Sequence, residues 1–148
     1  MSDTLCIRPA TGADLAAVLG LLDDCRLPTD DLTAALLSDF HVAECTPGEV
    51  VAVAGLEKSG SRGLLRSLAV TPDRRGQGLG EALVSQSELA ALVAGVREIY
   101  LLTPTAAGFF RRLGYQELSR NVVPAAIAAH PQFQRLCPAT ATCLGKRL

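Results

Sequence analysis

Two arginines and three glycines stand within seven residues, in the stretch Arg74 to Gly80 (RRGQGLG). Before them, Leu64 to Val70 is an apolar run that predicts a strand, and Thr71 to Asp73 supplies a proline-marked turn. A helical pattern follows and runs to about Ala94, with Gly95 as its expected C-terminal cap. Its expected buried face consists of Leu79, Ala82, Leu83, Ala90 and Val93. The first N–H groups of a helix lack intrahelical partners, the helix dipole favours negative charge, and glycine lets a ligand approach the backbone. The stretch therefore predicts an anion-binding loop.

The spacing of the glycines excludes two nucleotide-binding loops. The dinucleotide fingerprint G-x-G-x-x-G would need a glycine at Glu81, and the P-loop would need Gly-Lys-Ser/Thr. What remains is R-x-x-G-x-G, from Arg75 to Gly80, after a strand that ends in Leu-Ala-Val. This pattern resembles the pyrophosphate-binding signature of the GNAT superfamily of acetyl-coenzyme A-dependent N-acetyltransferases. The alternative interpretation is a glycine turn that only caps a helix.

Length and composition indicate a single globular domain over residues 1–148. Hydrophobic residues make up 49% of the chain and charged residues 20%, which is typical of a folded protein. The net charge of −1 and the lack of a basic stripe argue against a nucleic-acid partner. No apolar run reaches the length of a membrane span, and the chain opens on an acidic segment that is no export signal. We therefore expect no membrane partner and a cytoplasmic location.

The chain has five cysteines, without C-x-x-C spacing, and we expect reduced thiols in apolar surroundings: Cys6, Cys25, Cys45, Cys137 and Cys143. Cys137 and Cys143 lie six residues apart and flank Pro138. Two thiols cannot fill a tetrahedral zinc site without further ligands. No metal site is predicted.

The order of elements predicts an α/β (α+β) fold with a mixed seven-stranded sheet and four or five helices. The predicted strands are Leu5–Arg8, His41–Cys45, Val50–Leu56, Leu64–Val70, Glu98–Thr103, Tyr115–Arg120 and Ala139–Leu148. The predicted helices are Gly12–Asp24, Leu32–Asp39, the one that follows the glycine loop, Thr105–Leu113 and Pro124–Ala129. Thr11 and Asp14 have the spacing of a capping box that begins the first helix, and His130-Pro131 should end the last one. Turns are expected at Thr46–Glu49 and Glu57–Gly63. Because a helix separates the Leu64 and Glu98 strands, these two strands should be parallel.

This order is similar to that of the GNAT fold over essentially the whole chain. Thr105 to Tyr115 (TAAGFFRRLGY) resembles a second signature of the superfamily, a helix that ends in glycine plus an aromatic residue. More closely, the segments LLRSLAV, TAAGFFRRLGY and LCPATATC resemble the arsenic-resistance N-acetyltransferase-like subfamily. The resemblance implies an acetyl-coenzyme A cosubstrate. The resemblance to the subfamily also leaves open that Cys137 and Cys143 bind a trivalent arsenical.

The resemblance also implies which residues hold that cosubstrate. The backbone N–H groups that would bind the pyrophosphate belong to Gly76, Gln77, Gly78, Leu79 and Gly80. Arg74 and Arg75 would add positive charge, although exposed arginines in such a loop are often only solvated. The backbone of Leu68, Ala69 and Val70 would meet the pantetheine arm as an added strand, and one of these N–H groups would act as oxyanion donor.

One position departs from the superfamily pattern. A tyrosine often stands four residues before the Gly-aromatic pair, where it protonates the departing thiolate, and this position is Phe110 here. A thiol with a pKa near 8.5 leaves as thiolate at pH 7 at a cost of roughly 2 kcal/mol, which is small beside the total acceleration of an enzyme. We expect Phe109 and Phe110 to pack against the cosubstrate or the core.

For the acceptor amine, Glu57 is the first candidate for a general base, because an ammonium must lose its proton before attack. A surface turn carboxylate is the alternative interpretation. Arg66 and Ser67 should point to opposite faces of their strand, so that either could face the acceptor, Ser67 as a catalytic residue and Arg66 as a partner for an acceptor carboxylate. His41 and His130 show no spacing to other ligands and are predicted to be structural.

The predicted function is acetyl transfer from acetyl-coenzyme A to the amine of a small molecule by direct attack. The acceptor could be an amino acid-like or arsenic-containing compound. Two other classes stay open: a non-catalytic acyl-coenzyme A sensor, motivated by Phe110, and a metalloid-responsive thiol protein. A homodimer through edge strands also stays open.

Overall fold

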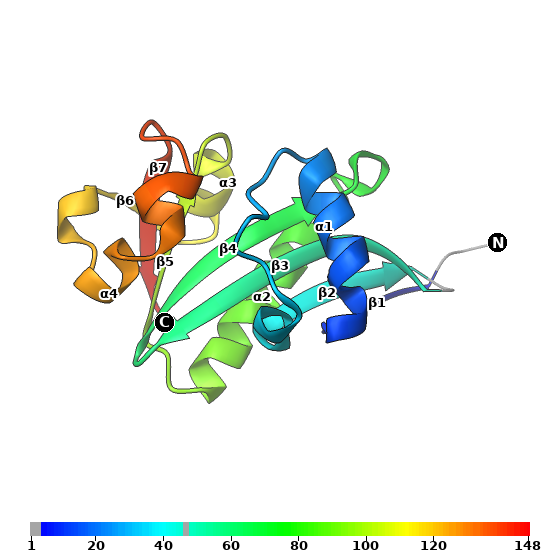
Figure 1. The fold of residues 1–148 in the computed structure, drawn as a ribbon. Coiled ribbons are helices and arrows are strands. Elements are labelled where there is room, and N and C mark those ends of the chain that lie inside the picture. Colours follow the sequence, from blue (N-terminus) through cyan, green and yellow to red (C-terminus); the bar gives the residue numbers. More distant parts are fainter. Residues whose placement is uncertain (1–3, 46–47) are drawn as a thin grey trace. The chain divides into compact units, whose positions relative to one another are not determined.

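The computed structural model describes residues 4–45 and 48–148. Their strands form one seven-stranded sheet in the order β1-β2-β3-β4-β5-β7-β6 (Figure 1). The strands are β1 (Leu5–Pro9), β2 (Phe40–Cys45), β3 (Glu49–Ser59), β4 (Arg62–Val70), β5 (Glu98–Thr103), β6 (Gln116–Leu118) and β7 (Thr142–Arg147). The prediction of a mixed seven-stranded sheet is confirmed, because β4 and β5 pair in parallel while β5 and β7 pair antiparallel.

The α-helices of the described residues are α1 (Leu15–Asp24), α2 (Leu79–Val93), α3 (Ala107–Arg112) and α4 (Ala125–Ala128). Shorter helical turns are η1 (Gly12–Asp14), η2 (Ala34–Asp39), η3 (Pro72–Arg74), η4 (Arg120–Val122) and the π-helical η5 (Gln132–Leu136). The helix expected at Leu32–Asp39 is wrong in type and start. It is the 3-10 helix η2, which starts after the extended Thr33 and ends where Phe40 enters β2. None of the described helices is both long and apolar enough to cross a membrane.

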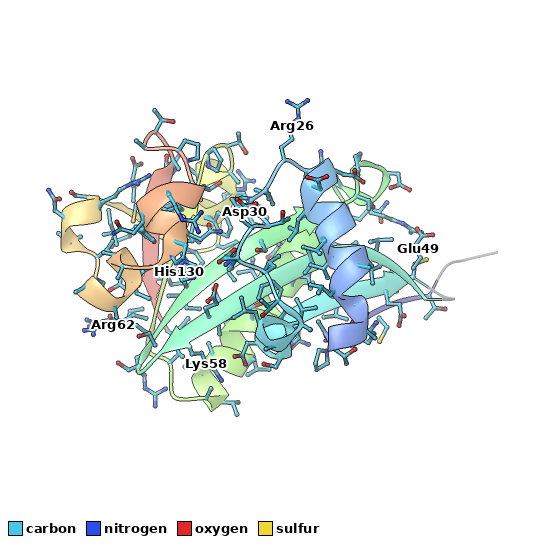
Figure 2. All side chains as sticks on the ribbon, viewed as in Figure 1. Arg26, Asp30, Glu49, Lys58, Arg62 and His130 are labelled. Atoms are coloured by element: carbon cyan, nitrogen blue, oxygen red, sulfur yellow. The ribbon has the colours of Figure 1, made fainter. Side chains whose placement is uncertain are left out.

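The hairpin between β3 and β4 is tighter than expected. The sequence predicts a turn from Glu57 to Gly63, but β3 runs to Ser59 and β4 starts at Arg62. The polar side chains at the ends of both strands are exposed to solvent, so their polarity does not prevent these residues from pairing in the sheet. Figure 2 labels two of these exposed side chains, Lys58 and Arg62. Gly60 takes the positive φ of 62° that the tight turn requires. The turn expected at Thr46–Glu49 lies partly outside the described residues.

The chain divides into two compact units. The first contains the chain up to Leu56 together with Ser67–Leu89, and the second contains Glu57–Arg66 and Ala90–Leu148. Both units therefore combine segments that are far apart in the sequence. The assignment of residues 1–148 to a single domain stays a prediction.

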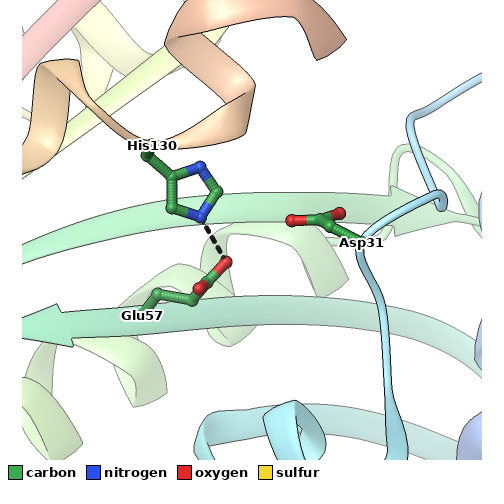
Figure 3. Close-up of side chains that lie close together, drawn as sticks. All are labelled: Asp31, Glu57 and His130. Carbon is green, nitrogen blue, oxygen red and sulfur yellow. Dashed lines mark hydrogen bonds and ion pairs between the residues drawn. The ribbon is translucent and has the colours of Figure 1, made fainter.

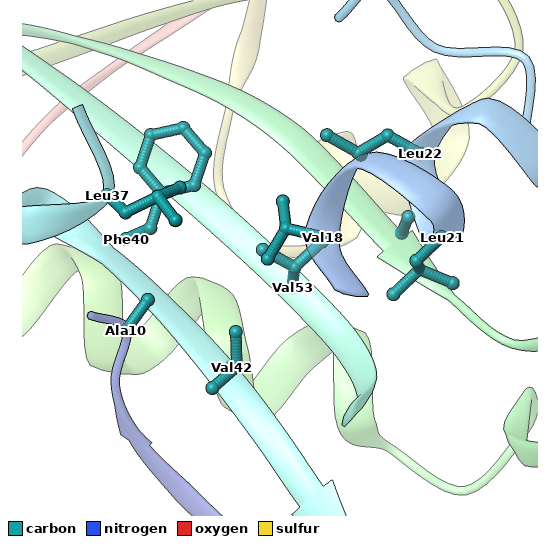
Figure 4. Close-up of a cluster of buried hydrophobic side chains, with 9 residues drawn as sticks. Ala10, Val18, Leu21, Leu22, Leu37, Phe40, Val42 and Val53 are labelled. Carbon is teal, nitrogen blue, oxygen red and sulfur yellow. The ribbon is translucent and has the colours of Figure 1, made fainter. Parts of the chain in front are cut away.

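In the first unit, α1 and α2 cover opposite faces of β2 and β3. Figure 4 shows one of the two apolar clusters, in which Val18 and Leu22 of α1 pack with Val42 and Val53. On the other face Leu83 of α2 joins a second cluster with alanines of both strands. The alternation along the strands produces this two-sided packing. The capping box predicted for Thr11 and Asp14 is present and begins η1, directly before α1.

The buried face of α2 differs from the prediction at two positions. The expected stripe ended in Ala90 and Val93, but both are exposed, Val93 with 83% of its surface accessible. Leu79 and Leu83 are buried as expected, and Val84, Ser87 and Ala91 are buried as well. Apolar residues occupy every side of this helix, so periodicity alone cannot select the buried side.

In the second unit, β5 lies between β4 and β7. The parallel ladder with β4 joins three register pairs, from Arg62 with Glu98 to Leu64 with Tyr100, whereas β5 pairs with β7 along its whole length. An apolar cluster forms over these strands and α4, with Leu64, Ile127 and Cys143 buried in it. Gly95 and Gly114 have positive φ values of 91° and 96° after α2 and α3, as predicted for helix C-caps.

Candidate functional site

The glycine loop lies in the first unit, where η3 leads from β4 to the first turn of α2. Gly76 and Gly78 have φ values of 78° and 82°, which only glycine adopts without strain, and no described atom lies within 4 Å of where their Cβ atoms would stand. Residues 75–78 are exposed. Consecutive N–H groups with alternating backbone geometry form a concave anion-binding nest. The loop thus has the geometry of an anion-binding nest.

The backbone donors of this loop are available. Arg75 N donates to Pro72 O at 3.4 Å and Ala82 N donates to Gly78 O at 3.0 Å. Between them, the N–H groups from Gly76 to Glu81 donate to no acceptor in the part of the chain that the structure describes. The predicted set of donors therefore coincides with the orphan groups at the start of α2.

The two arginines of the loop contact sulfur atoms and the backbone. Arg75 Nε donates to the carbonyl of Val70 at 3.0 Å, and its Nη2 lies 3.6 Å from Cys25 Sγ. Arg74 Nη2 lies 3.2 Å from Cys45 Sγ. Arg75 thus connects the exposed loop to the end of β4. A carbonyl oxygen has two lone pairs, so that Val70 O can accept a further donor beside this guanidinium.

The strand β4 has one strained residue, Ser67. Its φ is 59°, although serine seldom adopts the left-handed region, and such strain often occurs at functional sites. The strain coincides with a break in alternation, because Arg66 is buried while Ser67 and Leu68 are both half-buried. Ala69 is buried again and Val70 is half-buried. The backbone is therefore turned where the pantetheine contacts are predicted.

In the second unit, Phe110 of α3 lies 5% exposed in an aromatic cluster. Its ring meets Phe109 edge to face at 5.0 Å and Tyr115 at 5.5 Å between centroids. Of the two environments predicted for Phe110, the cosubstrate or the core, the structure shows packing in the core, and Phe109 is half-buried. Contact of either ring with the cosubstrate stays a prediction. Phe110 itself has no hydroxyl that could protonate a departing thiolate, as the tyrosine often found at this position would.

Glu57 of β3 is the centre of an ionic cluster in the second unit. His130 Nε2 lies 2.7 Å from Glu57 Oε2 (Figure 3). Arg66 Nη1 donates to the same oxygen at 2.7 Å. The side chain of Arg66 is fully buried, whereas that of Glu57 is 21% exposed. The surface-carboxylate interpretation of Glu57 is therefore wrong. The predicted roles of Glu57, Arg66 and Ser67 stay predictions.

Opposing effects set the pKa of the Glu57 carboxyl. Burial raises this pKa, but the hydrogen bonds from His130 and Arg66, together with the charge of Arg66, outweigh burial, so that the pKa lies below its usual value. Glu57 is hence an anion at neutral pH. A lowered pKa favours a role in binding a cation over a role as a proton acceptor.

His130 is the member of this cluster that the sequence did not indicate. It lies 73 residues from Glu57, at the joint between α4 and η5 (Figure 2). The only local signal is the pair His130-Pro131, which correctly predicted the end of a helix. The sequence predicts only a structural role for His130, and its bond to Glu57, a candidate catalytic carboxylate, was not expected.

The described thiols form no disulfide: all five cysteines are free, as predicted. Cys6 is exposed, however, which contradicts the expected apolar surroundings. Burial raises the pKa of the Cys143 thiol, and Cys137 Sγ donates to Gln132 Oε1 at 3.0 Å. Among the described residues, no group of three close metal ligands contains a cysteine. The described residues therefore supply no further ligand for a metalloid site at Cys137 and Cys143.

Known proteins resemble this chain in sequence and in fold. The amino-acid acetyltransferase of Pseudomonas fluorescens is 33% identical over 101 residues, which cover 67% of this chain and 23% of the relative. N-acetylglutamate synthase from Neisseria gonorrhoeae, complexed with coenzyme A and N-acetyl-glutamate, superposes with a TM-score of 0.85 at 20% identity, over 100% of this chain and 36% of that one. Rv2747 from Mycobacterium tuberculosis, in complex with CoA and NLQ, gives a TM-score of 0.82 at 24% identity, over 97% and 99% of the chains.

These comparisons differ in what they show. At 20% and 24% identity, the solved structures show a shared fold. The chain spans only 23% to 38% of the length of the first curated relatives that it matches. Residues 37–117, more than half of the chain, match the acetyltransferase (GNAT) domain family. The chain therefore belongs to the GNAT acetyltransferase domain family.

Proposed function

We propose that this protein transfers an acetyl group from acetyl-coenzyme A to the amine of an amino acid-like small molecule. The observation that carries the proposal is the exposed loop at the start of α2, where Gly76 and Gly78 have positive φ and the following N–H groups are available. The family assignment and the coenzyme A bound to the structural neighbours support the same cosubstrate. The named relatives support the acceptor class.

The residues that would hold acetyl-coenzyme A lie on β4 and the loop. The N–H groups from Gly76 to Gly80 would bind the pyrophosphate, and the backbone of Leu68, Ala69 and Val70 would bind the pantetheine arm. When bound, the cosubstrate supplies an activated acetyl thioester. The loop accepts it without rearranging its own side chains, because nothing stands within 4 Å of the missing Cβ atoms of Gly76 and Gly78.

Glu57 would bind the acceptor as an ammonium ion and would not take its proton. An alkyl ammonium has a pKa near 10.4, so that losing its proton to water at pH 7 costs roughly 4.6 kcal/mol. Transfer to the Glu57 carboxylate costs more than this, because its pKa lies below the usual carboxyl value and it therefore stays ionised at pH 7. Release to water is the less costly route. The proposal therefore assigns Glu57 to orientation and charge, in place of the general-base role predicted from sequence.

A sensor that binds acyl-coenzyme A without turnover is the second candidate, because Phe110 is buried among aromatic rings where the superfamily often has a tyrosine. A panel of amines and amino acids, incubated with acetyl-coenzyme A, separates the two functions. Acetyl transfer to any acceptor favours the enzyme. The arsenic-containing acceptor belongs to this panel, since only the sequence resemblance supports it.

Calorimetric titration of acetyl-coenzyme A tests the binding site. Gly78→Asp puts a negative charge beside the phosphates, and we expect the affinity to fall at least tenfold, about 1.4 kcal/mol. Gly78→Asn is the matched control, because asparagine has the same shape without charge and tolerates a positive φ. Gly60→Asp places the same aspartate at an open hairpin glycine with a φ of 62° and should leave binding unchanged. Equal affinities of Gly78→Asp and Gly78→Asn would refute the site.

A further inference from the structure

The carboxylate of Glu57 is held on one side only. Both donors, Arg66 Nη1 and His130 Nε2, engage Oε2 at 2.7 Å. Oε1 has no hydrogen-bond partner among the described residues. A carboxylate oxygen offers two lone pairs, so that Oε1 can still accept from a further donor. The cluster therefore presents one oriented, unoccupied anionic oxygen.

The imidazole of His130 is held from its other nitrogen. The backbone N–H of Gln132 donates to His130 Nδ1 at 3.0 Å. An N–H can donate only to a lone pair, so Nδ1 carries no proton and the ring proton lies on Nε2. His130 is then a donor to Glu57 in a fixed tautomer. The backbone N–H of Gln132, at the start of η5, therefore makes His130 the donor in its bond to Glu57.

The segment behind His130 is itself fixed. Pro131 begins the turn with a φ of −52°, and Gln132 is 5% exposed. Cys137 Sγ donates to Gln132 Oε1 at 3.0 Å, and Cys137 N donates to Gln132 O at 3.1 Å. The N–H that orients the imidazole thus belongs to a buried residue with its own side chain engaged. Such support is what a precisely oriented polar group requires.

We propose that His130 is a positioning residue for the acceptor: it holds the Glu57 carboxylate so that Oε1 receives the ammonium of a primary amine. This inference rests on the proposed acetyl transfer. Within the second unit, the titratable and charged groups that face Glu57 are His130 and Arg66. Arg66 supplies permanent charge from a fully buried position, while His130 supplies direction from a side chain that is 14% exposed.

The test compares His130→Ala with His130→Gln, because the amide N–H of glutamine can replace Nε2–H. We expect His130→Ala to lower kcat/KM for the acceptor about tenfold, through a higher acceptor KM, with the KM for acetyl-coenzyme A unchanged. His130→Gln should restore most of this loss. In a Glu57→Gln background, His130→Ala should have no further effect, because residues that act through one contact are not additive. Gln134→Ala removes a bond from the same turn, Gln134 Nε2 to Ala128 O at 2.7 Å, and should leave acceptor kinetics unchanged.

A second measurement does not depend on turnover. In ¹³C-glutamate-labelled protein, NMR follows the titration of the Glu57 carboxyl, whose midpoint should rise in His130→Ala and return in His130→Gln. An unmoved midpoint, or equal kinetic losses in both variants and in Gln134→Ala, would overturn the inference. If wild type acetylates no amine of the panel, the proposed function fails, and the role in acceptor binding fails with it. If the wild type is active and His130→Ala retains that activity in full, the inference about His130 is overturned but the proposed function is not.

Discussion

Arg75 donates from Nε to the carbonyl oxygen of Val70 at 3.0 Å, and this bond joins the glycine loop to the end of β4. Sequence resemblance assigns both residues to cosubstrate binding. The bond shows a further property of Arg75, since its guanidinium points back along the chain and braces the loop. Charge and bracing are separate contributions, and substitutions can separate them.

Arg75→Lys keeps the charge but lacks the planar guanidinium that reaches Val70. If the bracing bond matters, the lysine variant should bind acetyl-coenzyme A about as weakly as Arg75→Ala. We expect both to lose roughly fivefold in affinity, the worth of one hydrogen bond of about 1 kcal/mol. Titration calorimetry measures this. A lysine variant with wild-type affinity would show that only charge matters, and exposed Arg26→Ala serves as the control.

Phe110→Tyr introduces the hydroxyl that the superfamily often has at this position. We expect kcat near pH 7 to rise by up to about 30-fold, because protonating the thiolate is worth at most roughly 2 kcal/mol. The gain should vanish as the pH rises through about 8.5, where the thiolate leaves unaided. Unfolding free energy should fall by about 1–3 kcal/mol, since position 110 is buried. A pH profile of kcat checks the first effect, and urea unfolding checks the second; a gain that persists above pH 9 contradicts the assignment.

The ion pair of Arg8 with Asp14 makes folding pH-dependent. The Arg8 guanidinium lowers the pKa of Asp14 to about 2 against the opposing effect of burial, and the Thr11 N–H adds to the lowering. A carboxyl with a depressed folded pKa stabilises the fold above its unfolded pKa of 3.8, and this stability is lost as the pH falls toward 2. Asp14→Asn keeps the shape and should cost about 2 kcal/mol at pH 7.

Urea unfolding of wild type and Asp14→Asn at pH 7, 4 and 2.5 measures this difference. The gap in unfolding free energy should narrow only below pH 4. A gap that is constant over this range would mean that shape, not charge, stabilises the start of α1.

Two glycines of the first unit should respond oppositely to alanine. A Cβ at Gly55 would meet the ring of Phe40, which is fully buried, so that Gly55→Ala should destabilise by about 1–3 kcal/mol. Gly20 lies exposed within α1 with nothing within 4 Å of its Cβ position. Gly20→Ala should stabilise by about 0.5–1 kcal/mol through helix propensity. Thermal unfolding of both variants tests the packing, and a shift of the same sign in both contradicts it.

Local patterns in the sequence were sufficient for the loop and for most element boundaries. The C-cap glycines Gly95 and Gly114, the strand Glu98–Thr103 and the glycine loop before α2 follow from interactions within a few residues. Turn chemistry, capping and strand alternation act over that distance, so one chain segment contains all the information.

The tertiary structure decided everything that depends on partners from distant segments. Glu57 meets His130 only because topology brings α4 and η5 to the end of β3, and no spacing rule connects residues 73 positions apart. The buried side of α2 and the inward direction of Arg75 were likewise undecided, because apolar residues surround the helix and a long side chain can point either way. The sequence alone therefore determined the backbone that would bind a pyrophosphate. The charge state and orientation of the carboxylate that would bind the acceptor depended on the fold, since burial and hydrogen bonds from remote residues set both.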